Sequence, residues 1–361
     1  MRWKSRSAAV ALLLLAVFAL VEPHALRFAR AGALLAHLSA PADQSPGVQE
    51  RATVAAGARA RWYWPRDGRI TGSVVLAHGV HHKGIDEPRL QRFARELAGA
   101  GQLVLTPELS DIASYRITQG GVDVLKQAVH VAADDPRSGG KTGLIGMSFA
   151  GGLSLLAASD ASVGARLHFV TSVGGHHDLG RVLRFFLSDT VHAPSGKKPF
   201  EAHEYGLVVL VNQHLEALVA KQDRPCLGAA LQSWLKEERE RAVTLASQCS
   251  TAEARRIFAL LQAGKLKQLA PALGGLLLAH DAELAQLSPK GRMGDIRPPV
   301  YLLHGAHDNV IPPSETEWAE RELQGARHSA LVTPLLGHVE VEPSAQWLDQ
   351  VALVSFMARM L

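Results

Sequence analysis

The chain has 361 residues, of which 47% are hydrophobic and 20% are charged. This apolar fraction is enough for one large core with an insertion, and it excludes a disordered or fibrous protein. The net charge is +4, but the 38 basic residues are scattered and offset by 34 acidic residues. Because the sequence contains no basic block with interleaved aromatic residues, we do not expect a nucleic acid partner.

The N-terminal segment differs from the rest of the chain. Arg2, Lys4 and Arg6 precede an uncharged run at residues 8–21, as in a secretory signal or a short membrane anchor. As a helix this run would rise about 21 Å, less than the roughly 30 Å hydrocarbon core, so its length favours a signal. The nearest small-x-small cleavage pattern, residues 29–31, lies far beyond the run. An uncleaved anchor, with membrane association through residues 8–21, and a buried N-terminal helix are therefore alternatives.

From residue 60, short β-rich runs alternate with amphipathic helical patterns, which predicts a mostly parallel sheet with helices on both faces. Strands at 61–64 and 73–77 flank a turn at Asp67-Gly68 and are expected to form a hairpin. The elements expected next are a helix from Asp86, a strand at 103–105, a helix at 122–133, a strand at 142–145, a helix at 149–158 and a strand at 167–173.

The alternation stops from His176 to Arg297, where the patterns are helical. Helices are expected at 207–219 and 227–245, and Ser250 with Glu253 forms a capping-box pattern that would open another. A helical segment between two strands of one sheet is more economically a lid than a separate domain, so we interpret it as a cap. The predicted division is a leader and linker at 1–45, a core at 46–175 and 298–361, with strands at 300–303 and 330–332, and a cap at 176–297.

The turn at residues 146–151 carries a candidate nucleophile, Ser148. A serine hydroxyl must project clear of the backbone, beside an imidazole that takes its proton, before it can attack a carbonyl. A tight strand-to-helix turn achieves this, but it leaves room only for small neighbours, which Gly146, Ala150 and Gly151 are. Ala150 departs from the usual G-x-S-x-G pattern and still meets this steric requirement. The alternative is a glycine-rich turn without catalytic function.

Backbone donors for an oxyanion are expected on either side of this turn. His78-Gly79-Val80 ends the strand at 73–77, where a loop can direct an N–H at the developing negative charge. The second donor is the residue that follows the nucleophile. We therefore assign the N–H groups of Val80 and Phe149 to this role, with a simple strand-ending turn as the alternative for His78-Gly79.

Two further motifs follow the cap. His304-Gly305-Ala306-His307-Asp308 comes directly after the strand at 300–303, and Gly337-His338 comes after the last predicted strand. An acid can hold a catalytic imidazole in its working tautomer. We therefore assign Asp308 as the orienting acid and His338 as the base.

His78-Gly79, Gly146-x-Ser148, His304-Gly305-x-x-Asp308 and Gly337-His338 together resemble the α/β-hydrolase superfamily, and most closely its dienelactone-hydrolase and prolyl-oligopeptidase-like branch. The resemblance spans about residues 60–361 and is weakest across the cap. It implies the α/β-hydrolase fold, with Ser148 as nucleophile, His338 as base and then acid, and Asp308 as orienting acid. The chain order Ser, Asp, His is that of the superfamily.

Asp178 is a rival for the acid, because it follows the strand after the nucleophile helix, where some lipase-like members of the superfamily carry theirs. We favour Asp308 for its His-Gly-x-x-Asp context. The pairs His81-His82 and His176-His177 are expected at the same edge of the sheet. Without H-E-x-x-H or carboxylate spacing, these pairs are expected to line a pocket or bind loop backbone, and we expect no metal or other cofactor.

Cys226 and Cys249 have no metal-ligand spacing. Because export would permit a disulfide, a bridge between them and two buried free thiols are both open. We expect an exported or membrane-anchored protein with an extracytoplasmic catalytic domain.

The motifs predict a serine hydrolase that cleaves a small-molecule ester, or less readily an amide, through an acyl-enzyme on Ser148. An ester is favoured because no group besides His338 is evident that would protonate an amine leaving group. The alternatives are an acyltransferase with the same triad and a membrane-tethered binding protein without turnover. The leucine-rich cap helices indicate an apolar acyl or alcohol part, or else they only pack the lid.

Overall fold

The computed structural model describes residues 25, 27–36, 47–338 and 347–360. The apolar run at 8–21 lies outside these residues. Within the described ranges, no helix has the length and apolar character that a membrane crossing requires.

Eight strands form one central sheet. They are β1 (Val48–Ala55), β2 (Ala58–Pro65), β3 (Gly72–Ala77), β4 (Gln102–Pro107), β5 (Thr142–Met147), β6 (Leu167–Val173), β9 (Val300–Gly305) and β10 (His328–Thr333). Their order in the sheet is β1-β2-β4-β3-β5-β6-β9-β10. The β1–β2 and β2–β4 pairs are antiparallel and the remaining pairs are parallel, which confirms the predicted mostly parallel sheet.

The predicted hairpin between the strands on either side of Asp67-Gly68 is wrong. β4 lies between β2 and β3, and β3 is a fully buried strand with a parallel neighbour on each side. The hairpin is instead β1–β2. Its two loop residues, Ala56 and Gly57, have φ values of 54° and 71°, and positive φ at both positions is what a two-residue type I′ hairpin loop requires.

Helices cover both faces of the sheet, as predicted. The core helices are α2 (Pro88–Gly99), α3 (Ser110–Ala113), α4 (Gln119–Asp134), α5 (Phe149–Ala158), α6 (Ala161–Gly164), α15 (Ser314–Glu322) and α16 (Trp347–Met357). Along β3, Val75 and Ala77 belong to an apolar cluster that includes residues of α4, α5 and α15. Val74 and Leu76 alternate with them and belong to a second cluster, which includes residues of α2 and α16.

A helix over residues 27–36 adds to the second cluster. Its Ala31, Leu34 and Leu35 are buried together with Leu97 of α2 and Phe169 of β6. This differs from our expectation that residues 1–45 lie outside the catalytic fold, because the apolar face of this helix packs on the sheet.

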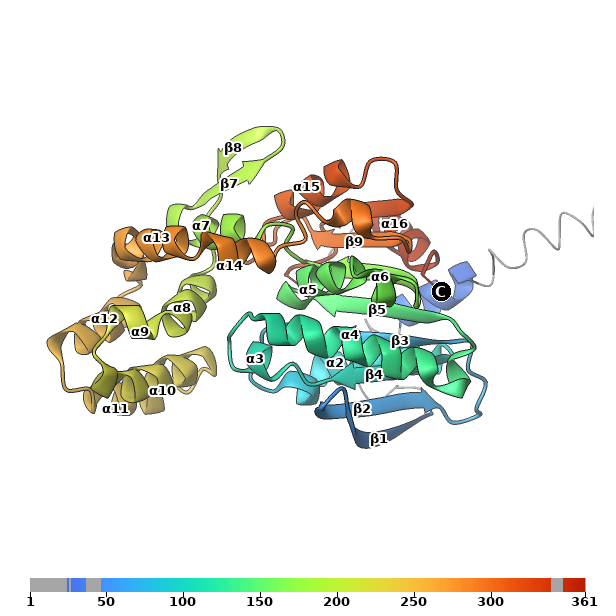
Figure 1. Cartoon of the computed structure of the whole chain (residues 1–361), viewed down its shortest axis with the longest axis horizontal. Helices are drawn as coiled ribbons and strands as arrows, with labels where there is room; N and C mark the ends of the chain where they lie inside the picture. Colours follow the sequence, from blue (N-terminus) through green and yellow to red (C-terminus); the bar gives the residue numbers. More distant parts are fainter. Residues whose placement is uncertain (1–24, 26, 37–46, 339–346, 361) are drawn as a thin grey trace, which may run out of the picture.

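The cap lies between β6 and β9 in the chain, beside the core at the left of Figure 1. It consists of α7 (Leu179–Ser188), β7 (Thr190–Ala193), β8 (Gly196–Pro199), α8 (Glu204–Gln213), α9 (Leu215–Leu218), α10 (Arg224–Leu235), α11 (Arg239–Ser247), α12 (Ala252–Gln262), α13 (Ala270–Ala279) and α14 (Asp281–Gln286). The β7–β8 hairpin was not predicted. The helix predicted at 227–245 is two helices, and Glu237 between them has a φ of 64°.

Two contacts fix the junction between α10 and α12. Cys226 and Cys249 form a disulfide, which resolves the alternative that the sequence left open. Asp223 accepts hydrogen bonds from the N–H groups of Ser250 and Thr251 at 2.7 and 2.8 Å. The N-cap of α12 is Thr251 rather than the predicted Ser250.

Many leucines of the cap helices pack inside the cap and against the core, whereas Leu278 is 73% exposed. Leu207, Leu227, Leu231, Leu273 and Leu277 are each at most 2% exposed and belong to the first apolar cluster. Their sequence signal therefore reflects packing of the lid, which was one of the two readings that the sequence allowed.

Candidate active site

The strand-to-helix turn between β5 and α5 carries Ser148. Its φ of 56° and ψ of −134° lie in a region that L side chains rarely adopt. The N–H of Ser148 donates to the carbonyl of Val173 at the end of β6, with a distance of 2.7 Å. The strained conformation is thus held by the neighbouring strand.

The neighbours of Ser148 must be small. A Cβ on Gly146 would collide with the backbone oxygen of Ala150 and with Ser154 Oγ, and one on Gly151 would lie 2.6 Å from Ser172 Oγ. Ala150 itself is fully buried with its methyl group accommodated. The replacement of the usual second glycine by Ala150 is therefore compatible with the turn.

Three predicted site residues, each from a different segment, form one hydrogen-bonded chain. Ser148 Oγ lies 2.7 Å from His338 Nε2, and His338 Nδ1 lies 2.6 Å from Asp308 Oδ2. Ser148 comes from the β5–α5 turn, Asp308 from the loop after β9, and His338 from the loop after β10. The structure thus brings together three side chains that are 30 and 190 residues apart in the chain.

The Asp308 carboxylate is buried and ionised. Burial alone would raise its pKa, but His338 and His304 outweigh burial, and the pKa is lowered from its usual value. Its Oδ1 accepts from the N–H groups of Val310 and Ile311 at 2.9 and 3.0 Å. An ionised Asp308 can only accept a hydrogen bond from His338 Nδ1, so Nε2 is left to accept the Ser148 proton.

His304 holds the loop after β9 that carries Asp308. Its Nε2 donates to the carbonyl of Ile311 at 2.8 Å, and its Nδ1 accepts from Thr316 Oγ1 at 2.7 Å. Its ring is completely buried. His304 therefore fixes the loop that carries Asp308 to α15.

The loop after β3 passes directly against the nucleophile. A Cβ on Gly79 would lie 3.1 Å from the Cβ of Ser148. His78 Nε2 accepts from the Leu109 N–H at 2.9 Å, so Nδ1 carries the proton and donates to the Gly79 carbonyl at 2.8 Å. Burial lowers the pKa of His78, which favours this neutral form. The peptide that contains the Val80 N–H is thereby held in place next to Ser148.

The cap also contacts this loop. Tyr205, in the first turn of α8, donates from its hydroxyl to the carbonyl of Val80 at 2.8 Å. Burial raises the pKa of Tyr205, so the hydroxyl stays protonated as a donor. Sequence reasoning missed this contact, because nothing in the pattern around Tyr205 shows which core loop it reaches.

The two histidine pairs have different surroundings. The half-buried rings of His81 and His82 stack with their centroids 4.5 Å apart, and His82 Nδ1 lies 3.4 Å from the Tyr115 hydroxyl. His176 is fully buried, donates from Nε2 to the Leu287 carbonyl at 2.9 Å, and lies 5.8 Å from the Phe149 ring. His176 therefore links the end of the cap to the helix that starts with Phe149.

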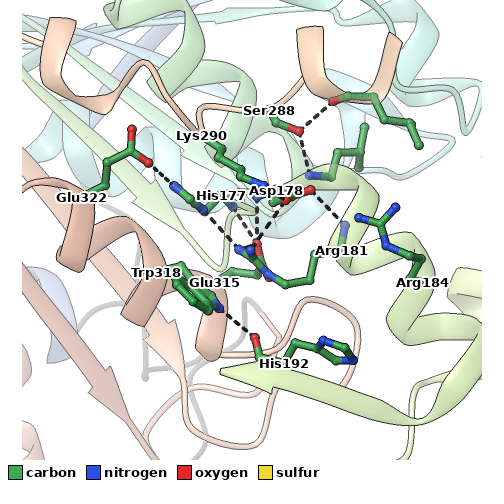
Figure 2. A network of polar contacts seen from close by, with 12 residues as sticks. His177, Asp178, Arg181, Arg184, His192, Ser288, Lys290, Glu315, Trp318 and Glu322 are labelled. Carbon is green, nitrogen blue, oxygen red and sulfur yellow. Dashed lines mark hydrogen bonds and ion pairs between the residues drawn. The ribbon is translucent and has the colours of Figure 1, made fainter. Parts of the chain in front are cut away.

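Six charged or titratable side chains form what we call the cap-root network, drawn in Figure 2. They are His177, Asp178, Arg181, Lys290, Glu315 and Glu322. Glu315 of α15 has a fully buried side chain, accepts from the N–H groups of His177 and Asp178 at 3.0 and 2.9 Å, and pairs with Arg181 Nε at 2.6 Å. The network joins both ends of the cap to α15.

The rival acid Asp178 belongs to this network. It caps α7 by accepting from the Arg181 N–H at 3.0 Å, and it accepts from Lys290 Nζ at 2.9 Å. Within the described residues, no hydrogen bond joins Asp178 to Ser148 or His338. Asp308, rather than Asp178, contacts the imidazole of His338.

One group of three potential metal ligands lies together in the described part of the chain: Asp223, Cys226 and Cys249. The two sulfur atoms are bonded to each other, so neither is available as a thiolate ligand. This group lies in the cap and includes none of the candidate catalytic residues.

The structure is similar to several solved structures. The rice cell wall degrading esterase LipA from Xanthomonas oryzae aligns with 87% of this chain and 89% of its own, at 12% identity and a TM-score of 0.52. A dienelactone hydrolase from Anabaena variabilis aligns with 86% of this chain and 98% of its own, at 18% identity and a TM-score of 0.44.

The acylaminoacyl peptidase of Pyrococcus horikoshii aligns with 88% of this chain, at 10% identity and a TM-score of 0.48, and this chain spans 41% of that peptidase. No protein-family model and no curated protein matches the sequence. The likeness to LipA agrees with the mostly parallel sheet. The chain has the α/β-hydrolase fold.

Proposed function

We propose that this protein is a serine hydrolase that cleaves carboxylic esters through an acyl-enzyme on Ser148. The observation that carries the proposal is the unbroken hydrogen-bonded chain from Ser148 through His338 to the buried, ionised Asp308. An imidazole held in this tautomer can accept the serine proton, which makes the hydroxyl a competent nucleophile.

In the first half of the reaction, Ser148 Oγ attacks the acyl carbonyl as its proton passes to His338 Nε2. The negative charge on the carbonyl oxygen is stabilised by the N–H groups of Val80 and Phe149. The ester C–O bond then breaks, and His338 returns the proton to the departing alcohol. In the second half, His338 takes a proton from water, which attacks the acyl-enzyme. The bond between the acyl carbon and Ser148 Oγ then breaks, His338 returns the proton to Ser148, and the acid is released.

Phe149 is the first residue of α5, so its N–H has no acceptor within the helix. This feature supports its role as a donor to the oxyanion. The contact of Gly79 with Ser148 supports the same role for the adjacent N–H of Val80.

We also infer that the domain works outside the cytoplasm. The Cys226–Cys249 disulfide supports this location, because such bonds form and persist in oxidising compartments. Expression in a reducing and an oxidising compartment, followed by counting free thiols, tests the inference.

The experiment that tests the proposed function compares the purified protein with its Ser148→Ala variant on p-nitrophenyl esters of graded chain length and on matched anilides. We expect an initial burst of p-nitrophenol equal to the enzyme concentration, followed by slower turnover, because the activated leaving group makes acylation faster than hydrolysis of the acyl-enzyme. The Ser148→Ala variant should show neither phase. Turnover by that variant at the wild-type rate would refute the proposal.

A further inference from the structure

A cavity of about 540 Å³ lies between the core and the cap. Its walls come from residues 116–119 at the start of α4, from residues 212–216 at the end of α8 and the start of α9, and from α14. None of the three triad side chains lines it. The cavity is therefore separate from the site of bond cleavage.

Elements that form two of these walls also contact the loop that carries Val80 and the helix α5, which follows Ser148. Tyr205 touches the Val80 carbonyl, and Asn212 lies seven residues further along α8, about 10 Å away on the same face of the helix. On another wall, the Leu287 carbonyl binds His176, whose ring lies 5.8 Å from Phe149. Two chains of side-chain contacts thus connect the cavity wall to the loop and the helix on either side of Ser148.

The end of α8 presents polar groups that lack protein partners. The half-buried amides of Asn212 and Gln213 make no side-chain hydrogen bond within the described residues. His214 is only 8% exposed, and its Nε2 is buried without a hydrogen-bond partner. The Asn212 and Gln213 amides line the cavity and are available to a ligand, whereas the His214 Nε2 atom has no surface accessible from the cavity and would reach a ligand only after its side chain moved.

The charges around the cavity balance. Arg116 and Arg224 are matched by Glu216 and Glu283, and Arg224 already donates to the backbone carbonyl of Glu216 at 2.9 Å. Burial, followed by the neighbouring His280, lowers the pKa of His214, which favours a neutral imidazole. Amides and a neutral imidazole both donate and accept hydrogen bonds. The polar part of this wall therefore fits an uncharged group with both donors and acceptors, and it lies beside an apolar part formed by Ile117, Leu215, Leu284 and Leu287.

We propose that this cavity binds the part of the substrate remote from the scissile carbonyl, and that this part carries uncharged amide or hydroxyl groups rather than a long alkyl chain. The proposal rests on the proposed hydrolase function and specifies its substrate class.

Two matched pairs of esters test the substrate class. The p-nitrophenyl ester of N-acetylglycylglycine is compared with p-nitrophenyl octanoate, whose acyl chain has the same number of atoms. Methyl 6-O-acetylglucoside is compared with cyclohexylmethyl acetate. We expect kcat/KM to be about tenfold higher for the polar member of at least one pair, mainly because its KM is lower. A difference in the first pair indicates that the cavity binds amide groups, and a difference in the second pair indicates hydroxyl groups. Equal or higher kcat/KM for the alkyl members of both pairs would overturn the proposal.

Substitutions in the cavity wall test its location. Asn212→Leu keeps the approximate shape of the side chain and removes its hydrogen bonds, and His214→Phe does the same for the imidazole. Each should lower kcat/KM for the preferred polar ester by about three- to tenfold and leave p-nitrophenyl acetate unchanged. The control Gln248→Leu removes an exposed amide elsewhere in the cap and should change neither.

An equal loss on p-nitrophenyl acetate in both cavity variants would overturn the proposal, because it would indicate a general effect on folding or catalysis. Failure of the underlying function gives a different result: the wild-type protein would then not hydrolyse p-nitrophenyl acetate at all.

Discussion

Two buried carboxylates follow neighbouring strands of the sheet, Asp178 after β6 and Asp308 after β9, and each has histidines before it in the sequence. They differ in their partners. Asp308 binds His338 and two backbone N–H groups, whereas Asp178 caps a helix and lies beside the cations Lys290 and Arg181. Asp178, which is already bound to cations, contributes to the cap root, whereas Asp308, which faces the imidazole of His338, can orient it.

The largest expected effect separates these two acids by activity. Asp308→Asn should lower kcat by about 10⁴-fold, because an amide facing Nδ1 favours the wrong tautomer of His338. Asp178→Asn should leave kcat within about threefold of wild type, because Asp178 has no contact with the imidazole. Steady-state kinetics on p-nitrophenyl acetate measures both. Similar losses of kcat in the two variants would contradict the assignment of Asp308, rather than Asp178, as the acid that orients His338.

A smaller effect is expected at the cap root. Glu315→Gln should lower the free energy of unfolding by roughly 3 kcal/mol, because the mostly buried guanidinium of Arg181 then loses the closer of its two carboxylate partners, and Asp178 remains 3.6 Å away. Glu320→Gln, on the exposed side of the same helix, is the matched control and should stay within about 0.5 kcal/mol of wild type. Urea unfolding followed by fluorescence checks both. If Glu315→Gln behaved like the control, the cap-root network would not stabilise the fold.

The smallest effect concerns pH. Burial lowers the pKa of His78, His176 and His177 from 6.5, so the unfolded chain binds protons at these groups before the folded protein does. Their contribution to stability is therefore complete above about pH 6.5 and is lost as the pH falls from there toward their folded pKa values. We expect Tm to fall between pH 7 and pH 5.

A substitution of His177 tests whether protonation of these histidines causes the fall in Tm. Its ring is faced by Glu322 and Glu315 of α15 and by Arg181 of α7, and its Nδ1 can accept from Arg181 only while unprotonated. His177→Gln should therefore show a shallower decline of Tm between pH 7 and pH 5. A Tm that is constant across this range in the wild-type protein would show that these histidines do not titrate as described.

The catalytic edge of the core could be predicted from the sequence for a physical reason. The turn around Ser148 tolerates only small residues, and the acid and base must follow particular strand ends, so these constraints leave short local patterns. Gly146-x-Ser148 and His304-Gly305-x-x-Asp308 are such patterns. The predicted β2–β3 hairpin failed because the turn signal at Asp67-Gly68 says nothing about which strand lies beside β3.

The contacts between the cap and the core have no comparable short pattern in the sequence. Tyr205 reaches Val80 across 125 positions of sequence, and Arg181 reaches Glu315 across 134. Such pairs depend on how the cap packs on the core, which is set by many apolar side chains together. The leucine pattern of the cap predicted its helices, but it could not distinguish a pocket for an apolar acyl or alcohol group from the interior of a lid.

The central claim is that Ser148 is the nucleophile of a working triad, and covalent labelling tests it most directly. A fluorophosphonate probe should phosphonylate the purified protein once per chain, with the modified residue identified by peptide mass spectrometry as Ser148. Labelling should be absent in Ser148→Ala and strongly slowed in Asp308→Asn. No labelling of the folded wild-type protein, or equal labelling of Ser148→Ala, would contradict the account.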